Sequence, residues 1–239
     1  MRSPIRIQET GESAIRVIGS SGDREADWRV VHKIARAVTT PGIEGVHSAI
    51  PTYDAVLIEV DPERTTLAAI HAIVQAVAGE IDPDEPLTQQ PREFVVPVVY
   101  GGEHGEDLAD VARLTGLSEE EVIAAHLAPT YVIRCLGAPG GSPMLDGPTL
   151  PVPVPRLTSP RTHVPQGAVS LAGRQATITP TAAPGGWSLI GRTPLSVLDL
   201  SEETLVPYAP GDILRFERID ERRFAELAGR RLTAMETAP

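Results

Sequence analysis

Proline and glycine divide the chain beyond residue 131 into runs too short for a helix of ordinary length. Both residue types disrupt regular structure, and the apolar runs between them hold only three to six residues. Many short strands separated by turns are typical of a β-barrel or a β-sandwich. The expected strands cover residues 131–136, 168–171, 176–178, 187–190 and 213–216.

The first part of the chain has a different pattern. Residues 14–18, 45–50, 55–60 and 94–99 have strand character. Two intervening segments repeat apolar residues every three or four positions, which predicts helices. The order strand, helix, strand, strand, helix, strand predicts a ferredoxin-like split βαβ domain with both helices on one sheet face, and hence an α+β protein. The helix faces carry Trp28, Val31, Ile34, Ala35 and Val38, then Leu67, Ile70, Ile73, Val74 and Val77.

Residues 82–91 hold three prolines and three acidic residues, which predicts a connection between domains. We therefore expect one domain over residues 1–90 and a second over residues 91–239. A helical hairpin opens the second domain: one helix over 107–114 stops at Gly116, and Ser118 with Glu121 forms a capping box for the next. Residues 220–239 are expected to form a short terminal helix with Phe224, Leu227 and Leu232 on one face.

Charge and cysteine content narrow the class of protein. The chain has 21 Lys and Arg against 32 Asp and Glu, and the net charge of −11 disfavours nucleic acid as a partner. No run approaches the ~20 apolar residues of a membrane span. The single cysteine, Cys135, excludes an intrachain disulfide and is interpreted as a small buried hydrophobe. A soluble, cytoplasmic protein is expected.

Two Pro-Arg pairs, Pro155-Arg156 and Pro160-Arg161, form the first candidate site. Proline stiffens the backbone beside each guanidinium, which could then hold a carboxylate or phosphate with two hydrogen bonds. Two solvated arginines on a surface loop are the alternative interpretation.

Residues 184–194 form the second candidate site. Gly185 and Gly186 allow backbone amides to approach a ligand, and Arg192-Thr193 could complete an anion cradle. The spacing is not that of a phosphate-binding P-loop. The alternative is a tight turn followed by a strand whose Trp187 packs under the barrel.

The third candidate site is residues 100–107, where Glu103, His104, Glu106 and Asp107 lie among glycines. Neighbouring side chains of this kind point in different directions, so we expect no metal site here. Asp107 is interpreted as a cap for the helix that follows. No sequence signature identifies a catalytic nucleophile or base.

The order of these motifs resembles the family of the 5-oxoprolinase B subunit, also labelled allophanate hydrolase subunit 1. The resemblance covers about residues 94–219 and is carried by six groups of residues in one order. They are Val96-Pro97-Val98-Val99-Tyr100-Gly101-Gly102, Gly116-Leu117-Ser118 with His126, Pro155-Arg156 with Pro160-Arg161, Ala172-Gly173 with Gln175, Pro184-Gly185-Gly186-Trp187 with Ile190-Gly191-Arg192-Thr193-Pro194, and Pro210-Gly211-Asp212.

The resemblance implies a cyclophilin-like β-barrel after the small α/β domain. It implies a non-autonomous subunit that works with a C-type subunit, resembling allophanate hydrolase subunit 2, and with an A-type subunit. Together such subunits cleave 5-oxoproline to glutamate at the expense of ATP with Mg²⁺, the nucleotide site being shared with the partner or on it. The expected substrate-binding residues are Arg156, Arg161, His163, Gln175, Gly185, Gly186, Trp187, Arg192 and Thr193.

Residues 137–145 depart from the family pattern Gly-Phe-x-Pro-Gly-Phe-x-Tyr-Leu, because all three aromatic residues are absent. Thr179 stands where the family has Tyr, and Ala176-Thr177 where it has Thr-Gly. If the first loop walls a pocket, the pocket differs by several hundred Å² of apolar surface, at roughly 150–250 Å² for each aromatic side chain. Two alternatives therefore stay open: a regulatory module that inhibits a histidine kinase, and a paralogue that acts on allophanate or urea-type amides.

Overall fold

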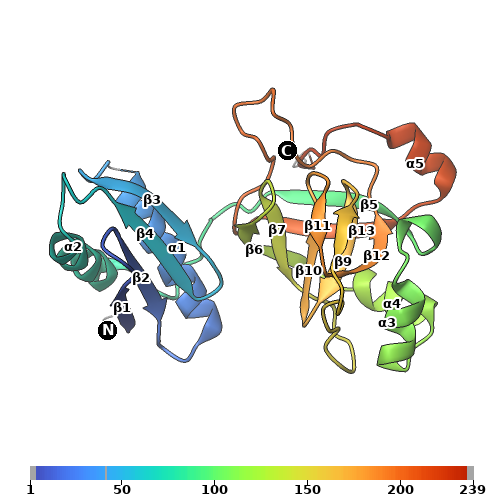
Figure 1. The fold of residues 1–239 in the computed structure, drawn as a ribbon, viewed down its shortest axis with the longest axis horizontal. Coiled ribbons are helices and arrows are strands. Elements are labelled where there is room, and N and C mark those ends of the chain that lie inside the picture. Colours follow the sequence, from blue (N-terminus) through green and yellow to red (C-terminus); the bar gives the residue numbers. More distant parts are fainter. Residues whose placement is uncertain (1–3, 41, 236–239) are drawn as a thin grey trace. The chain divides into compact units, whose positions relative to one another are not determined.

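The computed structural model describes residues 4–40 and 42–235 of the chain. The chain divides into two compact units, Met1–Gln89 and Gln90–Pro239 (Figure 1). None of the helices in residues 4–40 and 42–235 combines the length and the apolar composition of a membrane-spanning segment.

The first unit contains a four-stranded antiparallel sheet in the order β1-β2-β4-β3. The strands are β1 (Ile5–Glu9), β2 (Ala14–Gly19), β3 (Val46–Pro51) and β4 (Ala55–Val60). β3 and β4 pair antiparallel and are joined by residues 52–54, and their positions confirm the strands predicted over residues 45–50 and 55–60.

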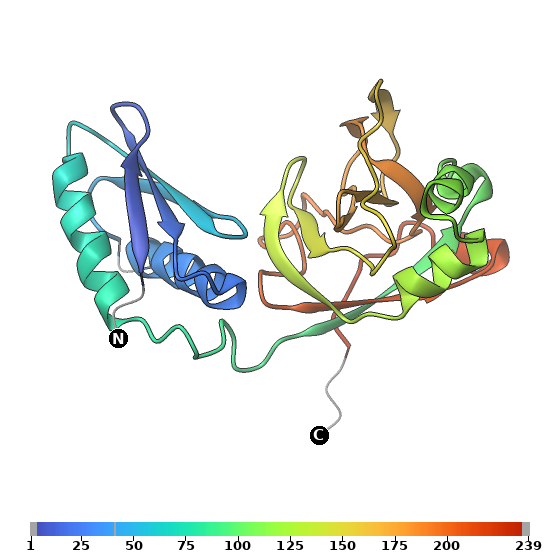
Figure 2. The same cartoon turned by 90° about the horizontal axis from the view of Figure 1, so that it is seen from below.

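Helices α1 (Arg24–Thr39) and α2 (Leu67–Glu80) supply the other half of this core (Figure 2). The side chain of Asp23 accepts hydrogen bonds from the first turn of α1, and Thr66 does the same for α2. The predicted face of α1 is buried, and the predicted face of α2 packs on the same core with Leu67, Ile73 and Val77 partly exposed. The core includes Ile15, Val31, Ile34, Val38, Ile58, Ile70 and Val74.

The predicted membership of this first sheet is wrong at one strand. Residues 94–99 were expected to complete it, but they belong to β5 (Glu93–Tyr100) in the second unit. The place beside β2 is taken instead by β1, which is joined to β2 by a short hairpin. Because β1 and β2 are joined by a short loop, their pairing costs little conformational entropy. The strand at residues 94–99 therefore remains available for the barrel.

Residues 82–87 are held along α1. The carbonyl oxygens of Asp82, Pro83 and Leu87 accept hydrogen bonds of 2.8, 2.8 and 2.7 Å from Lys33, Arg29 and Arg36, respectively. These three basic residues lie on one helix face, because they are spaced by four and three positions. Leu87 is also buried. The connection out of the first unit is therefore fastened to α1 as far as Leu87.

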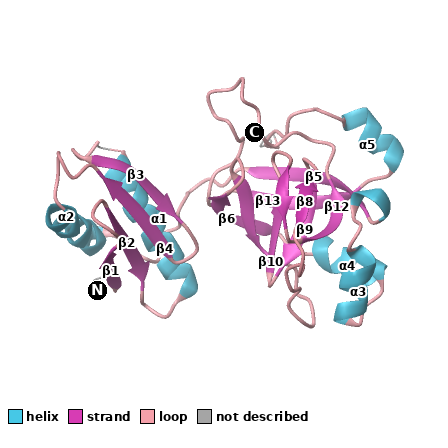
Figure 3. Cartoon of the chain, in the orientation of Figure 1, coloured by secondary structure: helices cyan, strands magenta, loops and turns pink. Residues whose placement is uncertain are grey.

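The second unit is a closed seven-stranded barrel in the order β10-β7-β6-β13-β5-β12-β9. The choice between a barrel and a sandwich is thus decided in favour of a barrel (Figure 3). All pairings are antiparallel except that of β13 with β5. The remaining barrel strands are β6 (Tyr131–Gly137), β7 (Ser142–Asp146), β9 (Ala168–Ala172), β10 (Gln175–Ile178), β12 (Ser188–Arg192) and β13 (Ile213–Arg218).

Aliphatic side chains fill the barrel, with Phe94 as a fully buried aromatic. Strand β5 contains Pro97, which cannot donate to a ladder. Its antiparallel neighbour β12 is paired with it only at Val99 and Tyr100, so the proline is tolerated. Every predicted strand beyond residue 131 is confirmed, but β7 was not predicted.

Two further strands, β8 (Arg161–Val164) and β11 (Ala183–Gly185), pair as a separate two-stranded ribbon. Neither was predicted from the sequence. Both contain or adjoin proline, and they are too short for an alternating pattern to stand out. This ribbon carries several of the predicted site residues.

The helices of this unit lie outside the barrel strands (Figure 1). A short 3₁₀ helix, η1 (Gly102–His104), precedes α3 (Leu108–Thr115) and α4 (Glu119–Leu127). The predicted left-handed cap at Gly116 and the capping box of Ser118 and Glu121 are both confirmed. The terminal helix α5 (Glu221–Leu227) is shorter than predicted, since Leu232 lies beyond it and packs into the barrel core.

Candidate functional site

A surface pocket of about 430 Å³ opens in the barrel unit. It lies between the long β7–β8 loop (residues 147–160), the β9–β10 turn and the start of β12. This volume falls within the range of small-molecule sites, roughly 300–1,000 Å³. The lining residues are Pro153, Val154, Pro155, Arg156, Ala172, Gly173, Gln175 and Trp187.

Arg156 and Trp187 form the polar and aromatic sides of this pocket. The Arg156 guanidinium carbon lies 5.9 Å from the centre of the Trp187 ring, within the distance of a cation–π contact. The adjacent residues hold the pair together, because the Leu157 amide donates to the Gly186 carbonyl at 2.8 Å. Arg156 makes no ion pair with a carboxylate of the described residues, so its donors face solvent and the pocket.

The wall that carries Arg156 is a stiff segment. Prolines alternate with valines over residues 151–155, and the backbone of Val154 exchanges two hydrogen bonds with Gly173, of 2.9 and 2.5 Å. Proline fixes the φ angles, and the bridge fastens the segment to the β9–β10 turn. The pocket is therefore largely preformed.

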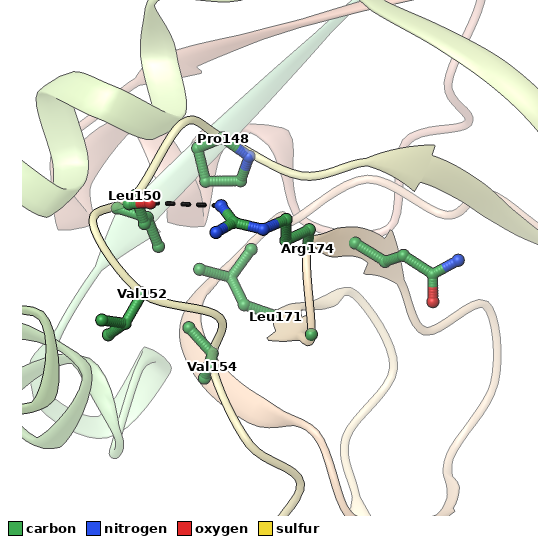
Figure 4. A pocket seen from close by; sticks show the side chains of 8 residues that line it. Pro148, Leu150, Val152, Val154, Leu171 and Arg174 are labelled. Atoms are coloured by element: carbon green, nitrogen blue, oxygen red, sulfur yellow. Dashed lines mark hydrogen bonds between the residues drawn. The ribbon is translucent and has the colours of Figure 1, made fainter.

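Gln175, at the start of β10, lines this pocket and a narrow cavity next to it. Gly173 and Arg174 form the β9–β10 turn, and the Arg174 guanidinium donates to the Leu150 carbonyl at 3.3 Å beside this cavity (Figure 4). Arg174 was not among the residues expected from the sequence. The sequence clue that could have identified it is an arginine directly after a glycine in a tight turn. The positive φ of Gly173 shapes this turn and sets Arg174 beside the cavity.

Arg161, which was expected to hold a substrate anion, does not belong to the pocket lining. Its guanidinium forks onto the carboxylate of Asp107, with hydrogen bonds of 2.9 and 2.8 Å, and reaches Glu106 at 3.4 Å. The hydrogen bonds to Asp107 raise the pKa of Arg161. Its donors are used by an internal carboxylate.

The expected role of the Asp107 side chain as a helix cap is wrong. Its side chain makes no capping hydrogen bond to α3. The buried carboxylate accepts from the Leu189 amide at 2.7 Å and from Arg161. A buried carboxylate is costly unless donors surround it, and these groups come from residues far apart in the sequence.

The expected anion cradle at Gly185 and Gly186 is not formed. Neither glycine has a positive φ, which an amide nest requires. Gly185 is paired with Arg161 in the β8–β11 ribbon, and a Cβ on it would lie 3.0 Å from Val164. These glycines provide room for close packing beside Trp187.

The remaining expected residues lie outside the pocket lining. Arg192, at the far end of β12, donates to the Gln166 carbonyl at 2.9 Å and lies over Phe224. Thr193 is buried, and its hydroxyl accepts from the Leu195 amide. His163 is exposed on β8. Of the nine expected residues, the pocket brings together Arg156, Gln175 and Trp187.

The loop that departs from the family pattern is not part of the pocket. Residues 138–141 form the tip of the β6–β7 hairpin, and the Gly141 carbonyl accepts from the Tyr208 hydroxyl at 3.1 Å. None of residues 137–145 lines the pocket over the described ranges. The missing aromatics therefore do not alter its walls.

Other titratable groups offer no ready nucleophile. Cys135 is buried, and burial raises the pKa of its thiol to about 11, which keeps it protonated. Nε2 of His104 lies 3.1 Å from a carboxylate oxygen of Glu221, and the His104 ring lies tilted against the ring of Phe224 at a centroid distance of 4.5 Å. The described part of the chain contains no group of three or more His, Cys, Asp or Glu residues that could hold a metal ion.

Known proteins share the sequence pattern of this chain. The family model for the carboxyltransferase domain, subdomain C and D, matches residues 5–208. The B subunit of 5-oxoprolinase from Bacillus subtilis (strain 168) is 32% identical over 229 residues, which cover 92% of this chain and 95% of that protein.

Two solved structures share the fold. The crystal structure of TTHA0988 superposes with a TM-score of 0.73 at 33% identity and covers 87% of this chain. The present chain spans only 40% of that protein. The K. lactis urea amidolyase has a TM-score of 0.80 at 17% identity, over 99% of this chain and 16% of its own length. At that identity the likeness concerns the fold alone.

Proposed function

This chain belongs to the family of the carboxyltransferase domain, subdomain C and D, and from that premise we propose that it is the B-type subunit of a 5-oxoprolinase-like amidohydrolase. The proposed complex hydrolyses the lactam of 5-oxoproline to glutamate and couples this step to ATP hydrolysis. The observation that carries the proposal is the 32% identity that runs through 95% of a 5-oxoprolinase B subunit.

The pocket suits a small ligand with one carboxylate and one amide. Arg156 offers a guanidinium that no protein carboxylate occupies, which supports binding of a ligand carboxylate by charged hydrogen bonds. Trp187 offers an apolar face for a flat ring, and the Gln175 amide can donate to or accept from a lactam. In the proposal these three residues bind and orient 5-oxoproline.

The pocket lacks the groups that would perform hydrolysis. Among its described lining residues there is no Ser, Cys, His, Asp, Glu or Lys, so none can act as a nucleophile or general base. A binding surface without reactive groups supports a non-autonomous role. We therefore assign the reacting groups to a C-type subunit, with an A-type subunit completing the complex.

ATP with Mg²⁺ does not fit this pocket as a self-contained site. Its described lining residues supply no carboxylate ligand for Mg²⁺, which prefers oxygen donors, and the sequence has no P-loop. We accordingly assign the nucleotide to a partner subunit or to a surface shared with it. In the proposal this chain binds the lactam and does not form a complete nucleotide site by itself.

The test is ATP hydrolysis by the reconstituted complex. We expect this chain alone to be inactive, and the complex with its C-type and A-type subunits to hydrolyse ATP when 5-oxoproline is added. 2-Pyrrolidinone, the same lactam without a carboxylate, is the control and should not stimulate. Equal ATP hydrolysis with and without 5-oxoproline overturns the proposal.

The same experiment separates the alternatives. Stimulation by allophanate or a urea derivative, but not by 5-oxoproline, identifies a paralogue with another amide substrate. Binding to a histidine kinase, together with failure to assemble with a C-type subunit, identifies a regulatory module. The β6–β7 hairpin, which lacks the aromatic residues of the family pattern, does not favour either alternative, because it lies outside the pocket.

A further inference from the structure

We propose that Asp107 and Arg161 are positioning residues that set the Trp187 ring in the pocket. Neither residue lines the pocket. Both are connected to the short segment that carries Trp187, one on each side of it. The inference rests on the proposed function only for the identity of the ligand.

Asp107 holds the segment on the C-terminal side of Trp187. Its carboxylate accepts from the Leu189 amide at 2.7 Å, and its own amide donates to the Leu189 carbonyl at 2.9 Å. Both peptide groups of Leu189 are therefore bound by one residue. Leu189 is two positions from Trp187, so this contact fixes where β12 begins.

Arg161 holds the segment on the N-terminal side. Its backbone is paired with Gly185 in the β8–β11 ribbon, two positions before Trp187. Its guanidinium forks onto Asp107, with hydrogen bonds of 2.9 and 2.8 Å. The two anchors of the Trp187 segment are thus joined by one bidentate ion pair.

The ion pair is suited to this task because its carboxylate is fully satisfied. Asp107 is only 6% exposed, and the Arg161 side chain is 23% exposed. Removing the guanidinium leaves a buried carboxylate with an unused oxygen, which favours local rearrangement to reach water. Leu189 is bonded to the same carboxylate, so that rearrangement moves the start of β12 and Trp187 with it.

The test measures Trp187 directly. The chain has two tryptophans, so Trp28→Phe leaves Trp187 as the sole tryptophan, whose emission is excited selectively over that of the tyrosines. In that background, Asp107→Asn and Arg161→Ala are expected to increase acrylamide quenching of Trp187 and to shift its emission maximum to the red. Arg161→Lys keeps the charge but loses the fork, and it should give an intermediate shift.

Asp212→Asn is the matched control. Asp212 is a second buried carboxylate of this unit that accepts from backbone amides, of Arg92 and Ala209, and pairs with an arginine. It is not connected to the Trp187 segment. A similar loss of thermal stability without a change in Trp187 quenching is expected for this variant.

Affinity for 5-oxoproline is measured by calorimetry on the same full-length variants. Asp107→Asn and Arg161→Ala should weaken binding by about tenfold, the effect of roughly one net hydrogen bond, while Asp212→Asn retains it. A Trp187 signal that shifts in a chain that binds no 5-oxoproline supports the positioning role and overturns the proposed function. Unchanged quenching and emission in folded Arg161→Lys and Asp107→Asn chains overturns the positioning role.

Discussion

The Tyr100 hydroxyl lies 2.8 Å from Nδ1 of His126, whose imidazole is completely buried between α4 and the barrel. Nε2 of the same ring has no hydrogen-bond partner among the described residues. Phe216 and Tyr131 enclose the ring, at centroid distances of 4.4 and 5.6 Å. A charged imidazole in this apolar surrounding would be costly, so His126 is neutral in the folded protein.

The stability of the second unit should therefore fall as the solution is acidified. Burial lowers the pKa of His126 from 6.5 to about 3. Between these values the unfolded chain binds a proton that the folded chain does not, so the stabilisation is present above about pH 6.5 and is lost as pH falls. The expected contribution is at most about 1.4 kcal/mol per pH unit in that window. Urea unfolding followed by Trp187 fluorescence in the Trp28→Phe chain measures it.

His126→Gln does not titrate and should flatten this pH dependence. His71→Gln replaces an exposed histidine of the first unit and controls for the loss of a histidine as such. An unaltered slope in His126→Gln would contradict the assignment of the effect to this buried ring.

Gly105→Ala is expected to prevent folding of the barrel unit or to cost several kcal/mol. A Cβ at this position would lie 2.2 Å from the Ile190 carbonyl oxygen, a backbone atom that cannot turn away. Gly79→Ala, in helix α2, meets nothing within 4 Å and should instead stabilise its unit by about 0.5–1 kcal/mol. Thermal unfolding of both variants tests the pair, and a fully stable Gly105→Ala chain would disprove the close approach.

Arg156→Ala should weaken binding of 5-oxoproline by about 1.5–3 kcal/mol, or roughly 10- to 150-fold, through loss of a charged hydrogen bond. Arg222→Ala removes an exposed arginine on α5 and serves as the control for net charge. Isothermal titration of each variant measures the change. Equal affinities would return Arg156 to the class of solvated surface arginines.

Residues 82–87 should resist proteolysis while α1 holds them. Arg29→Ala combined with Arg36→Ala removes two of the three side chains that bind carbonyls of this segment. Cleavage after Glu85 by a glutamate-specific protease should then become faster, which mass spectrometry of the fragments can follow. Arg222→Ala is again the control, and a double variant cleaved at the parental rate would show that the segment is held by other contacts.

Local signals in the sequence determined much of the secondary structure. The helix periodicities, the Gly116 stop and the capping box at Ser118 act within a few residues, so they could be recognised in place. The same holds for the barrel strands that were predicted after residue 131, which are β6, β9, β10, β12 and β13. The strand at residues 94–99 was recognised, but its sheet was not, because strand pairing depends on distant partners.

The candidate site was predicted only in part, for the same physical reason. A Pro-Arg pair and a Gly-Gly-Trp motif indicate exposed, stiff segments, and the fold brings Arg156 and Trp187 of these motifs to one pocket. Whether an arginine faces a ligand or an internal carboxylate is decided by residues 54 positions away, as Arg161 and Asp107 show. The sequence by itself thus determined the helices, most of the longer strands, the family resemblance and the stiffness of the site loops. The tertiary structure alone decided which charges neutralise each other and which remain free, because those pairings form only when the barrel closes.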